Sequence, residues 1–166
     1  VPWGMKGEWA LAASASGLFL LPTATAERER YGTPGSLAAD LRWADVTSAR
    51  TLQRPIDLRS VCAAVISGHM AGAMEKLLEQ SVEHANVRKQ FGKSIGKFQA
   101  IQQQLSVMAE HVFAARAAAE SGSRGGWQSR DYLPAPLQAA AAKSRCGDAV
   151  VPVATTAHAV HGAVSI

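Results

Sequence analysis

The residues best suited to binding chemistry lie in one stretch of the chain, where Arg88, Gln90 and Phe91 are followed by Gln99. An arginine offers a planar set of hydrogen-bond donors that fits phosphate oxygens, and a glutamine donates and accepts without adding charge. The stretch therefore indicates a site for a pyrophosphate or a ribose. The alternative is that Arg88 only compensates the negative end of a helix dipole and that Gln99 is a solvated surface residue.

Two helices must position this stretch, and the spacing of apolar residues predicts both. Apolar residues repeat at steps of three and four over residues 58–87 and again over residues 98–121. Gly92 can take the left-handed conformation that ends a helix, so we expect an antiparallel helical hairpin with the turn residues at one end. The two apolar faces consist of Met70, Met74, Leu77, Leu78 and Val82, and of Ile101, Leu105, Met108 and Val112.

A third helix is predicted over residues 136–161. Pro136 suits the first turn of a helix, whereas Pro152 should kink it. Three helices with one apolar stripe each bury those stripes against one another. The expected fold is therefore mainly α, with an antiparallel helical bundle at its centre. The third stripe consists of Cys146, Val150, Val153, Ala157 and Val160.

The N-terminal part of the chain has a different pattern. Residues 8–12, 18–21 and 38–43 read as short strands, and residues 26–36 read as a charged loop that contains glycine and proline. Pro55 restricts the residue before it to extended conformations, and Asp57 can cap the helix that follows. We expect a partial β domain over residues 1–53 and a helical domain over residues 54–166.

Composition narrows the classes of partner. The net charge is +4 and the pI is near 9.4, which would permit contact with nucleic acid. Acidic residues interrupt the basic ones, however, as in the alternating segment 27–30, and we expect no nucleic-acid partner. The apolar run at residues 17–21 is too short to cross a bilayer, so we expect no membrane partner.

The cysteines and histidines indicate neither a disulfide nor a metal site. Cys62 and Cys146 lie far apart in apolar helical patterns, which is typical of buried free thiols in a reducing compartment. With no recognisable targeting segment, this predicts a cytoplasmic location. His158 and His161 could share a helical face, but no carboxylate or cysteine completes a ligand set, and we expect no metal site.

The central stretch also carries a resemblance to a known family. Residues 87–92 and 98–102 read V-R-K-Q-F-G and F-Q-A-I-Q, which resembles the "R-x-x-F-G, then F-Q-A-I-Q" signature of the acyl-CoA dehydrogenases. Residues 63–73 resemble the small-residue helix that precedes this signature. Residues 159–165 resemble the segment "Q-x-H-G-G-x-G", although Ala159, Ala163 and Ser165 replace its usual glutamine and two glycines. The similarity extends from about Arg54 to Ile166.

This resemblance implies a fold and a cofactor. The helical part would be the C-terminal bundle of such an enzyme, and the strands would be the tail of its middle β-barrel domain. In the family, the signature reaches the diphosphate and adenosine of FAD in a neighbouring subunit, which assigns Arg88, Gln90, Phe91 and Gln99 to cofactor binding. The glycine segment adds Gly162. The implied reaction, typical of fatty acid metabolism, is FAD-dependent α,β-dehydrogenation of an acyl-CoA thioester.

The resemblance also implies partners. An oxidoreductase of this family would self-associate as a dimer or tetramer or pair with a related subunit. An acceptor similar to electron-transfer flavoprotein would receive its electrons.

The catalytic base is the part of this machinery that the sequence does not supply. By resemblance, a glutamate base occupies one of two places, and the first corresponds to Leu58, which cannot accept a proton. The second lies beyond Ile166. Asp57 is better explained as a helix cap and Cys62 as a packing residue, so the catalytic residue stays unassigned. Two functions remain open: an acyl-CoA dehydrogenase represented by an incomplete chain that is inactive alone, and a non-catalytic subunit that supplies an FAD clamp to a catalytic partner.

Overall fold

A computed structural model describes residues 3–53, 56–124 and 133–162 of the chain. The chain divides into two compact units, Val1–Ile56 and Asp57–Ile166. Some residues named in the sequence analysis lie outside these described ranges. These residues are Arg54 and Pro55 at the expected domain boundary, and Ala163 and Ser165, which replace the usual glycines.

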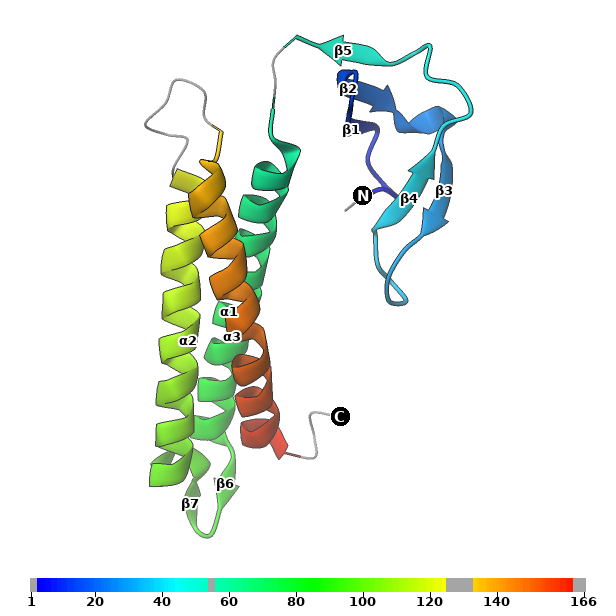
Figure 1. Ribbon diagram of the computed structural model, residues 1–166. Helices are drawn as coiled ribbons and strands as arrows, with labels where there is room; N and C mark the ends of the chain where they lie inside the picture. The colour runs from blue at the N-terminus through cyan, green and yellow to red at the C-terminus, as the bar shows by residue number, and fades with distance from the viewer. Residues whose placement is uncertain (1–2, 54–55, 125–132, 163–166) are drawn as a thin grey trace. The chain divides into compact units, whose positions relative to one another are not determined.

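In its described residues, the second unit is a bundle of three helices that run antiparallel to their sequence neighbours (Figure 1). The expected fold, a mainly α protein with a helical bundle preceded by short strands, is confirmed. The helices are α1 (Leu58–Val87), α2 (Gln99–Arg124) and α3 (Pro136–His161).

The core of the bundle lies along the line where the three helices meet. Met108, Val112, Cys146 and Val153 have no exposed surface and form one cluster with Met74. Burial of a side chain of this size stabilises a fold by about 1.5–3 kcal/mol, so this cluster accounts for a large part of the driving force. The apolar spacing found in the sequence is therefore the spacing of the core.

One residue of the apolar face predicted for the third helix was assigned to the core wrongly. Val150 is 38% exposed, whereas Ala149 is fully buried. The buried residues Cys146 and Val153 lie on the same face of α3 as Ala149, three residues before it and four residues after it. Position 149 therefore points inward, and position 150 lies toward the edge of that face. The sequence pattern favoured the larger valine because hydropathy does not register how closely two helices pack.

Helices α2 and α3 approach each other closely at Gly122. A Cβ atom at this position would lie 2.6 Å from the Cβ of Ala142 and 3.2 Å from the carbonyl oxygen of Gln138. Real Cβ atoms do not approach one another to that distance, so the packing of the two helices requires glycine at this point.

The turn between α1 and α2 is a small β-hairpin. Strand β6 (Lys89–Gln90) pairs antiparallel with β7 (Lys93–Ser94), and a single 3-10 turn, η2 (Ile95–Lys97), leads into α2. Phe91 and Gly92 connect the strands with φ of 51° and 78°. Two-residue hairpin turns favour positive φ at both central residues because that twist matches the strands. The prediction that Gly92 ends a helix is therefore wrong: it closes the hairpin.

The first unit contains two small antiparallel sheets in its described residues. One has the order β1-β2-β5 with Ser14 paired to Gly17, and the other consists of β3 and β4. Leu18 and Leu21 are buried on one face of β2. The strands are β1 (Trp9–Ser14), β2 (Gly17–Pro22), β3 (Glu27–Arg30), β4 (Ala39–Arg42) and β5 (Arg50–Leu52).

Two local predictions need correction. Residues 27–30, expected in a loop, form β3, whose four residues are all exposed. Because no side chain of β3 is buried, the strand has no alternation of apolar residues to reveal it, and its pairing with β4 is what defines it. Cys62, expected to be buried, is exposed on α1, whereas Cys146 is buried as expected.

Helix α1 has the length and apolar character that a membrane span requires, with a mean hydropathy of 1.2 over its most apolar window. Core helices of soluble bundles meet the same criterion. Ala64, Ala71 and Met74 of α1 are buried in the bundle, where α1 contacts α2 and α3, and 28% of the most apolar window is buried.

Candidate functional site

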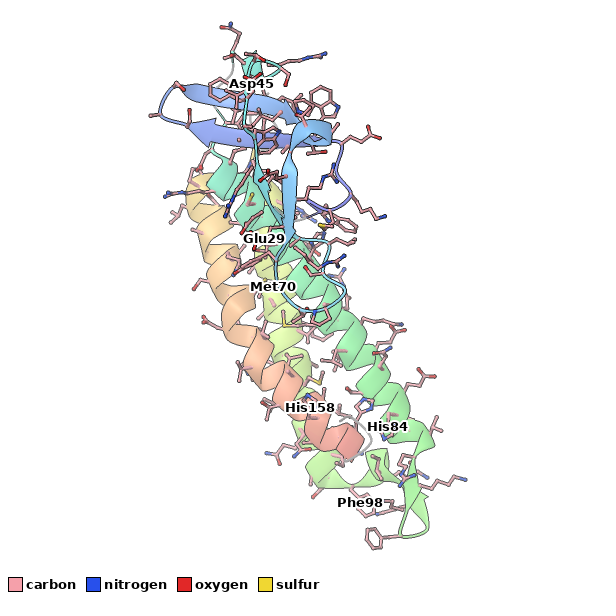
Figure 2. The ribbon with its side chains drawn as sticks, turned by 90° about the vertical axis from the view of Figure 1, so that its right-hand side faces the viewer. Glu29, Asp45, Met70, His84, Phe98 and His158 are labelled. Carbon is pink, nitrogen blue, oxygen red and sulfur yellow. The ribbon has the colours of Figure 1, made fainter. Side chains whose placement is uncertain are left out.

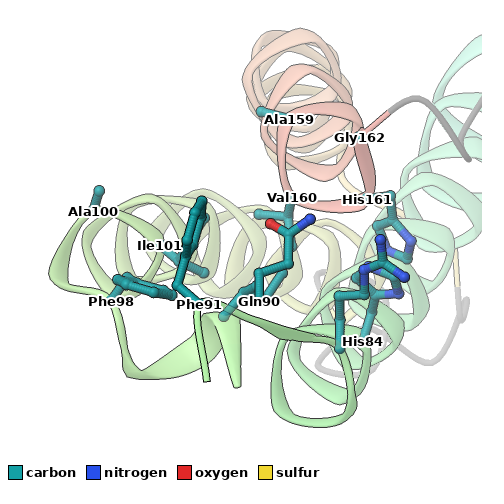
Figure 3. A pocket seen from close by; sticks show the side chains of 12 residues that line it. His84, Gln90, Phe91, Phe98, Ala100, Ile101, Ala159, Val160, His161 and Gly162 are labelled. Atoms are coloured by element: carbon teal, nitrogen blue, oxygen red, sulfur yellow. The ribbon is translucent and has the colours of Figure 1, made fainter. Parts of the chain in front are cut away.

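A cavity opens at the end of the bundle that carries the hairpin (Figure 3). Its volume is about 690 Å³, within the range of about 300–1,000 Å³ typical of small-molecule sites. Four predicted site residues line it, namely Arg88, Gln90, Phe91 and Gly162. The full lining is His84, Arg88, Gln90, Phe91, Ile95, Phe98, Ala100, Ile101, Ala159, Val160, His161 and Gly162.

Gln99 is the predicted site residue that does not line this cavity. It is exposed at the first position of α2, next to the lining residues Phe98 and Ala100. The fold therefore brings Arg88 and Gln90 from the hairpin together with Gly162 from the end of α3, and leaves Gln99 on the adjoining surface.

Backbone hydrogen bonds fix the position of Arg88. Its N–H donates to the carbonyl of His84 at 2.8 Å and closes the last turn of α1, while its own carbonyl accepts from the N–H of Ile95 at 2.9 Å. Ile95 packs with Ala85 and Val160 in a small apolar cluster at this end of the bundle. Arg88 is thus held between α1 and η2, and its exposed side chain extends from a rigid base.

Aromatic residues form the hairpin side of the cavity. Phe91 and Phe98 meet edge to face with ring centroids 6.3 Å apart, and the Lys93 ammonium lies 4.2 Å from the centre of the Phe98 ring. Phe91 is nevertheless 92% exposed. An aromatic ring that is almost fully exposed beside a cation is well placed to contact a planar ligand or another protein surface.

Gly162 marks the other side of the cavity. It follows α3 with a φ of 68°, and its N–H donates to the carbonyl of His158. A φ in this range is unfavourable for residues with a side chain, so glycine suits the position. The turn lets the chain leave the helix beside the cavity.

Two histidines that the sequence did not suggest for this site also line it. His84 lies in the last turn of α1 and His161 ends α3, and their rings stack with centroids 4.5 Å apart. Figure 2 shows His84, His158 and Phe98 toward the same end of the bundle, with Met70 farther along α1. The sequence contained a usable signal, since positions 84 and 161 both fall in the last turn of a predicted helix, but their contact depends on how the two helices are aligned.

The lining suits a ligand that is both anionic and partly apolar. No aspartate or glutamate is among the lining residues, which include an arginine, a glutamine and two histidines. The remaining residues are aromatic, aliphatic or glycine. A diphosphate attached to a flat heterocycle has this combination of properties, and the donor set therefore fits the cofactor FAD.

The opposite end of α1 carries the position where a base was sought. Asp57 caps the helix, as predicted: its carboxylate accepts from the N–H of Arg59 at 3.1 Å and from the hydroxyl of Ser60 at 2.5 Å. The Ser60 hydrogen bond holds the pKa of Asp57 below its usual value. Leu58, the next residue, is half-buried and has no group that could accept a proton.

Taken together, the fold and the site define an antiparallel helical domain with a ligand cavity and a protruding basic hairpin at one end. Comparison with known proteins identifies the family. The sequence pattern of the family described as "Acyl-CoA dehydrogenase, C-terminal domain" matches residues 61–166. The chain therefore belongs to the acyl-CoA dehydrogenase family.

Individual relatives agree with this assignment. Acyl-CoA dehydrogenase IpdE2 of Mycobacterium tuberculosis is 28% identical over 109 residues, which cover 66% of this chain and 32% of that protein. 3-Sulfinopropanoyl-CoA desulfinase of Paraburkholderia xenovorans is 34% identical over 97 residues, or 56% of this chain and 23% of that protein. The chain thus matches a third or less of the length of these relatives.

Solved structures extend the likeness to both units. Glutaryl-CoA dehydrogenase from Mycobacterium smegmatis superposes with a TM-score of 0.75 at 25% identity, over 98% of this chain and 46% of that one. The ChsE4-ChsE5 complex from Mycobacterium tuberculosis gives a TM-score of 0.76 at 22% identity, over 99% of this chain and 48% of that one. Because the superpositions cover 98% and 99% of this chain, the resemblance includes the strands as well as the bundle. The chain spans just under half the length of each of these proteins.

Proposed function

We propose that the whole protein is an FAD-dependent acyl-CoA dehydrogenase and that the hairpin end of its bundle holds the FAD diphosphate of a neighbouring subunit. The observation that carries this proposal is the cavity that gathers Arg88, Gln90, Phe91 and Gly162, four of the five residues that the family resemblance assigns to FAD. When bound, FAD supplies the acceptor for the hydride that leaves the acyl group.

The residues of this chain have separable roles in the proposed site. Arg88 donates charge-assisted hydrogen bonds to phosphate from a backbone fixed by α1 and η2. Gln90 adds neutral donors and acceptors, and Phe91 offers a ring face to the adenine or to the adjoining subunit. We assign Gln99, which is exposed beside the lining residues Phe98 and Ala100, to the more exposed part of the same ligand.

A second candidate function rests on Leu58. The position that resembles one of the two family sites for a glutamate base holds a leucine, and Asp57 beside it is engaged as a helix cap. The chain would then belong to a subunit that contributes the FAD clamp to a catalytic partner. Association with a related subunit has a parallel in the ChsE4-ChsE5 complex, which is similar in fold.

The test of the FAD site uses the full-length protein in its native assembly. Replacement of Arg88 by alanine removes a charge-assisted hydrogen bond of about 1.5–3 kcal/mol, and the FAD dissociation constant should rise roughly 10- to 100-fold. Arg88→Lys should recover part of this loss because an ammonium cannot reproduce the planar fork. Flavin fluorescence measures the affinity, and sedimentation reports the oligomeric state.

Arg124→Ala is the matched control, because Arg124 ends α2 at the other end of the bundle and pairs with Glu120 at 3.3 Å. It should leave the FAD affinity unchanged. If Arg88→Ala also leaves the affinity unchanged in an intact oligomer, only the helix-dipole interpretation of Arg88 remains. An assay of the purified full-length protein with acyl-CoA and an artificial electron acceptor separates the two candidates: retained FAD without turnover favours the non-catalytic subunit.

A further inference from the structure

The cavity has a wall that the FAD clamp described above does not use. His84 and His161 stack with ring centroids 4.5 Å apart and planes 24° apart, and Figure 3 shows the two rings facing each other beside Gln90. One ring comes from the last turn of α1 and the other from the last turn of α3. The pair therefore links the ends of two helices at the rim of the cavity.

A buried serine sets the tautomer of His161. The hydroxyl of Ser81, which is fully buried, donates to the carbonyl of Leu77 at 2.8 Å, and the same oxygen lies 3.3 Å from Nε2 of His161. A hydroxyl has one proton to donate. With that proton donated to Leu77, we assign Nε2 of His161 as the donor to Ser81, which leaves the ring lone pair of the neutral form on Nδ1. His161 can then gain a proton on Nδ1 without breaking its bond to Ser81.

The surroundings oppose a permanent charge on His161. Burial lowers the pKa of His161, and the nearby His84 and His158 lower it further. Glu83 and Arg88 are the other charged side chains at the adjoining cavities, while the lining residues from η2 to the first turn of α2 are the apolar Ile95, Phe98, Ala100 and Ile101. The carbonyl groups in the last turns of α1 and α3 carry partial negative charge and act in the opposite direction.

We propose that the His84–His161 pair takes up a proton when a diphosphate occupies the cavity, so that the pair becomes a second contact for phosphate beside Arg88. This inference rests on the proposed function, because it assigns a further binding role within the same site. In the absence of an anion, burial and the neighbouring histidines disfavour a charge on His161. An anion nearby stabilises an imidazolium through direct electrostatic attraction. Two imidazolium rings at 4.5 Å would repel each other, so the pair gains at most about one proton.

The inference makes the affinity depend on pH with a definite sign. Ligand binding raises the pKa of His161, so the extra affinity is complete below the pKa of the free protein and is lost as the pH rises through the pKa of the complex. Each unit by which ligand raises this pKa corresponds to about a tenfold change in the dissociation constant.

Two ligands of this reaction class carry the required diphosphate, namely FAD and coenzyme A. The experiment therefore titrates each of them separately into the full-length protein freed of flavin, by calorimetry at neutral pH in several buffers that differ in ionisation enthalpy. The dependence of the apparent heat on the buffer gives the number of protons taken up on binding. NMR titration of the histidine ring protons then identifies the residue that is protonated.

The variants are chosen to keep the fold. His161→Gln retains a donor for Ser81, and His84→Gln retains a side chain of similar size, but neither glutamine can be protonated. His69→Gln is the matched control, because His69 is an exposed histidine of the same helix about 22 Å along its axis from His84. We expect uptake of several tenths of a proton with FAD for the unmodified protein and His69→Gln. In His161→Gln the uptake should disappear, and the affinity below pH 7 should fall about 3- to 10-fold.

The possible results separate the inference from the proposed function. If FAD binds but proton uptake is zero, or is unchanged in both cavity variants, the inference is overturned and the FAD function stands. Binding of coenzyme A with histidine-dependent uptake, in a protein that does not bind FAD, supports the inference and overturns the FAD function. If neither ligand binds, both are overturned.

Discussion

The middle of the bundle and its hairpin end are built on opposite principles. In the middle, Met108, Val112, Cys146 and Val153 are fully buried, and toward the end opposite the hairpin α2 approaches α3 so closely at Gly122 that no side chain fits. At the hairpin end, the chain leaves a cavity of about 690 Å³ and exposes 92% of Phe91. Tight packing provides stability in the first region, and incomplete packing leaves donors and an aromatic ring available for a ligand in the second.

The hairpin end also carries backbone strain that the middle does not. Phe91 has a φ of 51°, and residues with a Cβ atom adopt the left-handed region at a cost of roughly 1–2 kcal/mol. Asparagine or glycine would form this turn more easily. A phenylalanine at the tip of the turn therefore opposes local stability, which is expected where contact with a ligand or a neighbouring subunit determines the residue.

The largest effect should come from the middle of the bundle. Met108→Ala removes a fully buried side chain and leaves a cavity among tightly packed neighbours, so the free energy of unfolding should fall by about 2–5 kcal/mol. Val107→Ala is the control, because Val107 is 46% exposed on the same helix and should cost less than about 1 kcal/mol. Urea denaturation followed by circular dichroism measures both. Equal losses would show that the packing of the middle is not what stabilises the bundle.

The second prediction tests the close approach of α2 and α3 with two glycines. An alanine usually stabilises a helix by about 0.5–1 kcal/mol relative to glycine. Gly147→Ala should show this gain, because a Cβ atom there meets nothing within 4 Å. Gly122→Ala should instead lose about 1–3 kcal/mol, since its Cβ atom would overlap Ala142. Opposite signs in thermal unfolding are the expected result, and gains at both positions would contradict the packing described here.

The third prediction concerns Phe91. Phe91→Asn should leave the free energy of unfolding unchanged or raise it by less than about 1 kcal/mol, because asparagine relieves the strained φ and the exposed ring contributes little packing. The FAD affinity of the full-length assembly should decrease in the same variant. Thermal unfolding of the flavin-free protein and flavin fluorescence measure the two quantities. A clear loss of stability would indicate that Phe91 serves the fold of the hairpin rather than its contacts.

The smallest effect should come from the cap at the start of α1, at the end of the bundle opposite the hairpin. Hydrogen bonds from Ser60 and Arg59 hold the pKa of Asp57 below its usual value of 3.8. A carboxyl group whose folded-state pKa is lowered stabilises the fold above the unfolded-state pKa, and this stability is lost as the pH falls through the folded-state pKa. Asp57→Asn should therefore flatten the decline of the melting temperature below pH 4 and change it little at pH 7. An unchanged acid profile would remove the capping role.

The sequence predicted much of this fold because the side of a helix that packs against the core is marked by apolar residues at steps of three and four along that same helix. Apolar residues at helical spacing fixed α1 and α3 at their observed ends and placed Met108 and Cys146 in the core. Strand β3 was not predicted because all of its residues are exposed, so they show no alternation of buried and exposed positions. Its pairing with β4 depends on residues elsewhere in the chain. Gly92 was correctly expected to have a positive φ, but the hairpin that it closes depends on the pairing of β6 with β7.

The same distinction, between what the sequence predicts and what depends on tertiary structure, applies to the candidate site. By itself, the sequence determined the chemical identity of the hairpin residues, since Arg88, Gln90 and Phe91 are neighbours in the chain and carry their donors and ring wherever the turn is placed. Tertiary structure alone decided that Gly162 and His161 face them while Gln99 does not, and that His84 stacks on His161. The physical reason is that the alignment of α3 against α1 results from packing along the whole core, and no short segment contains that information.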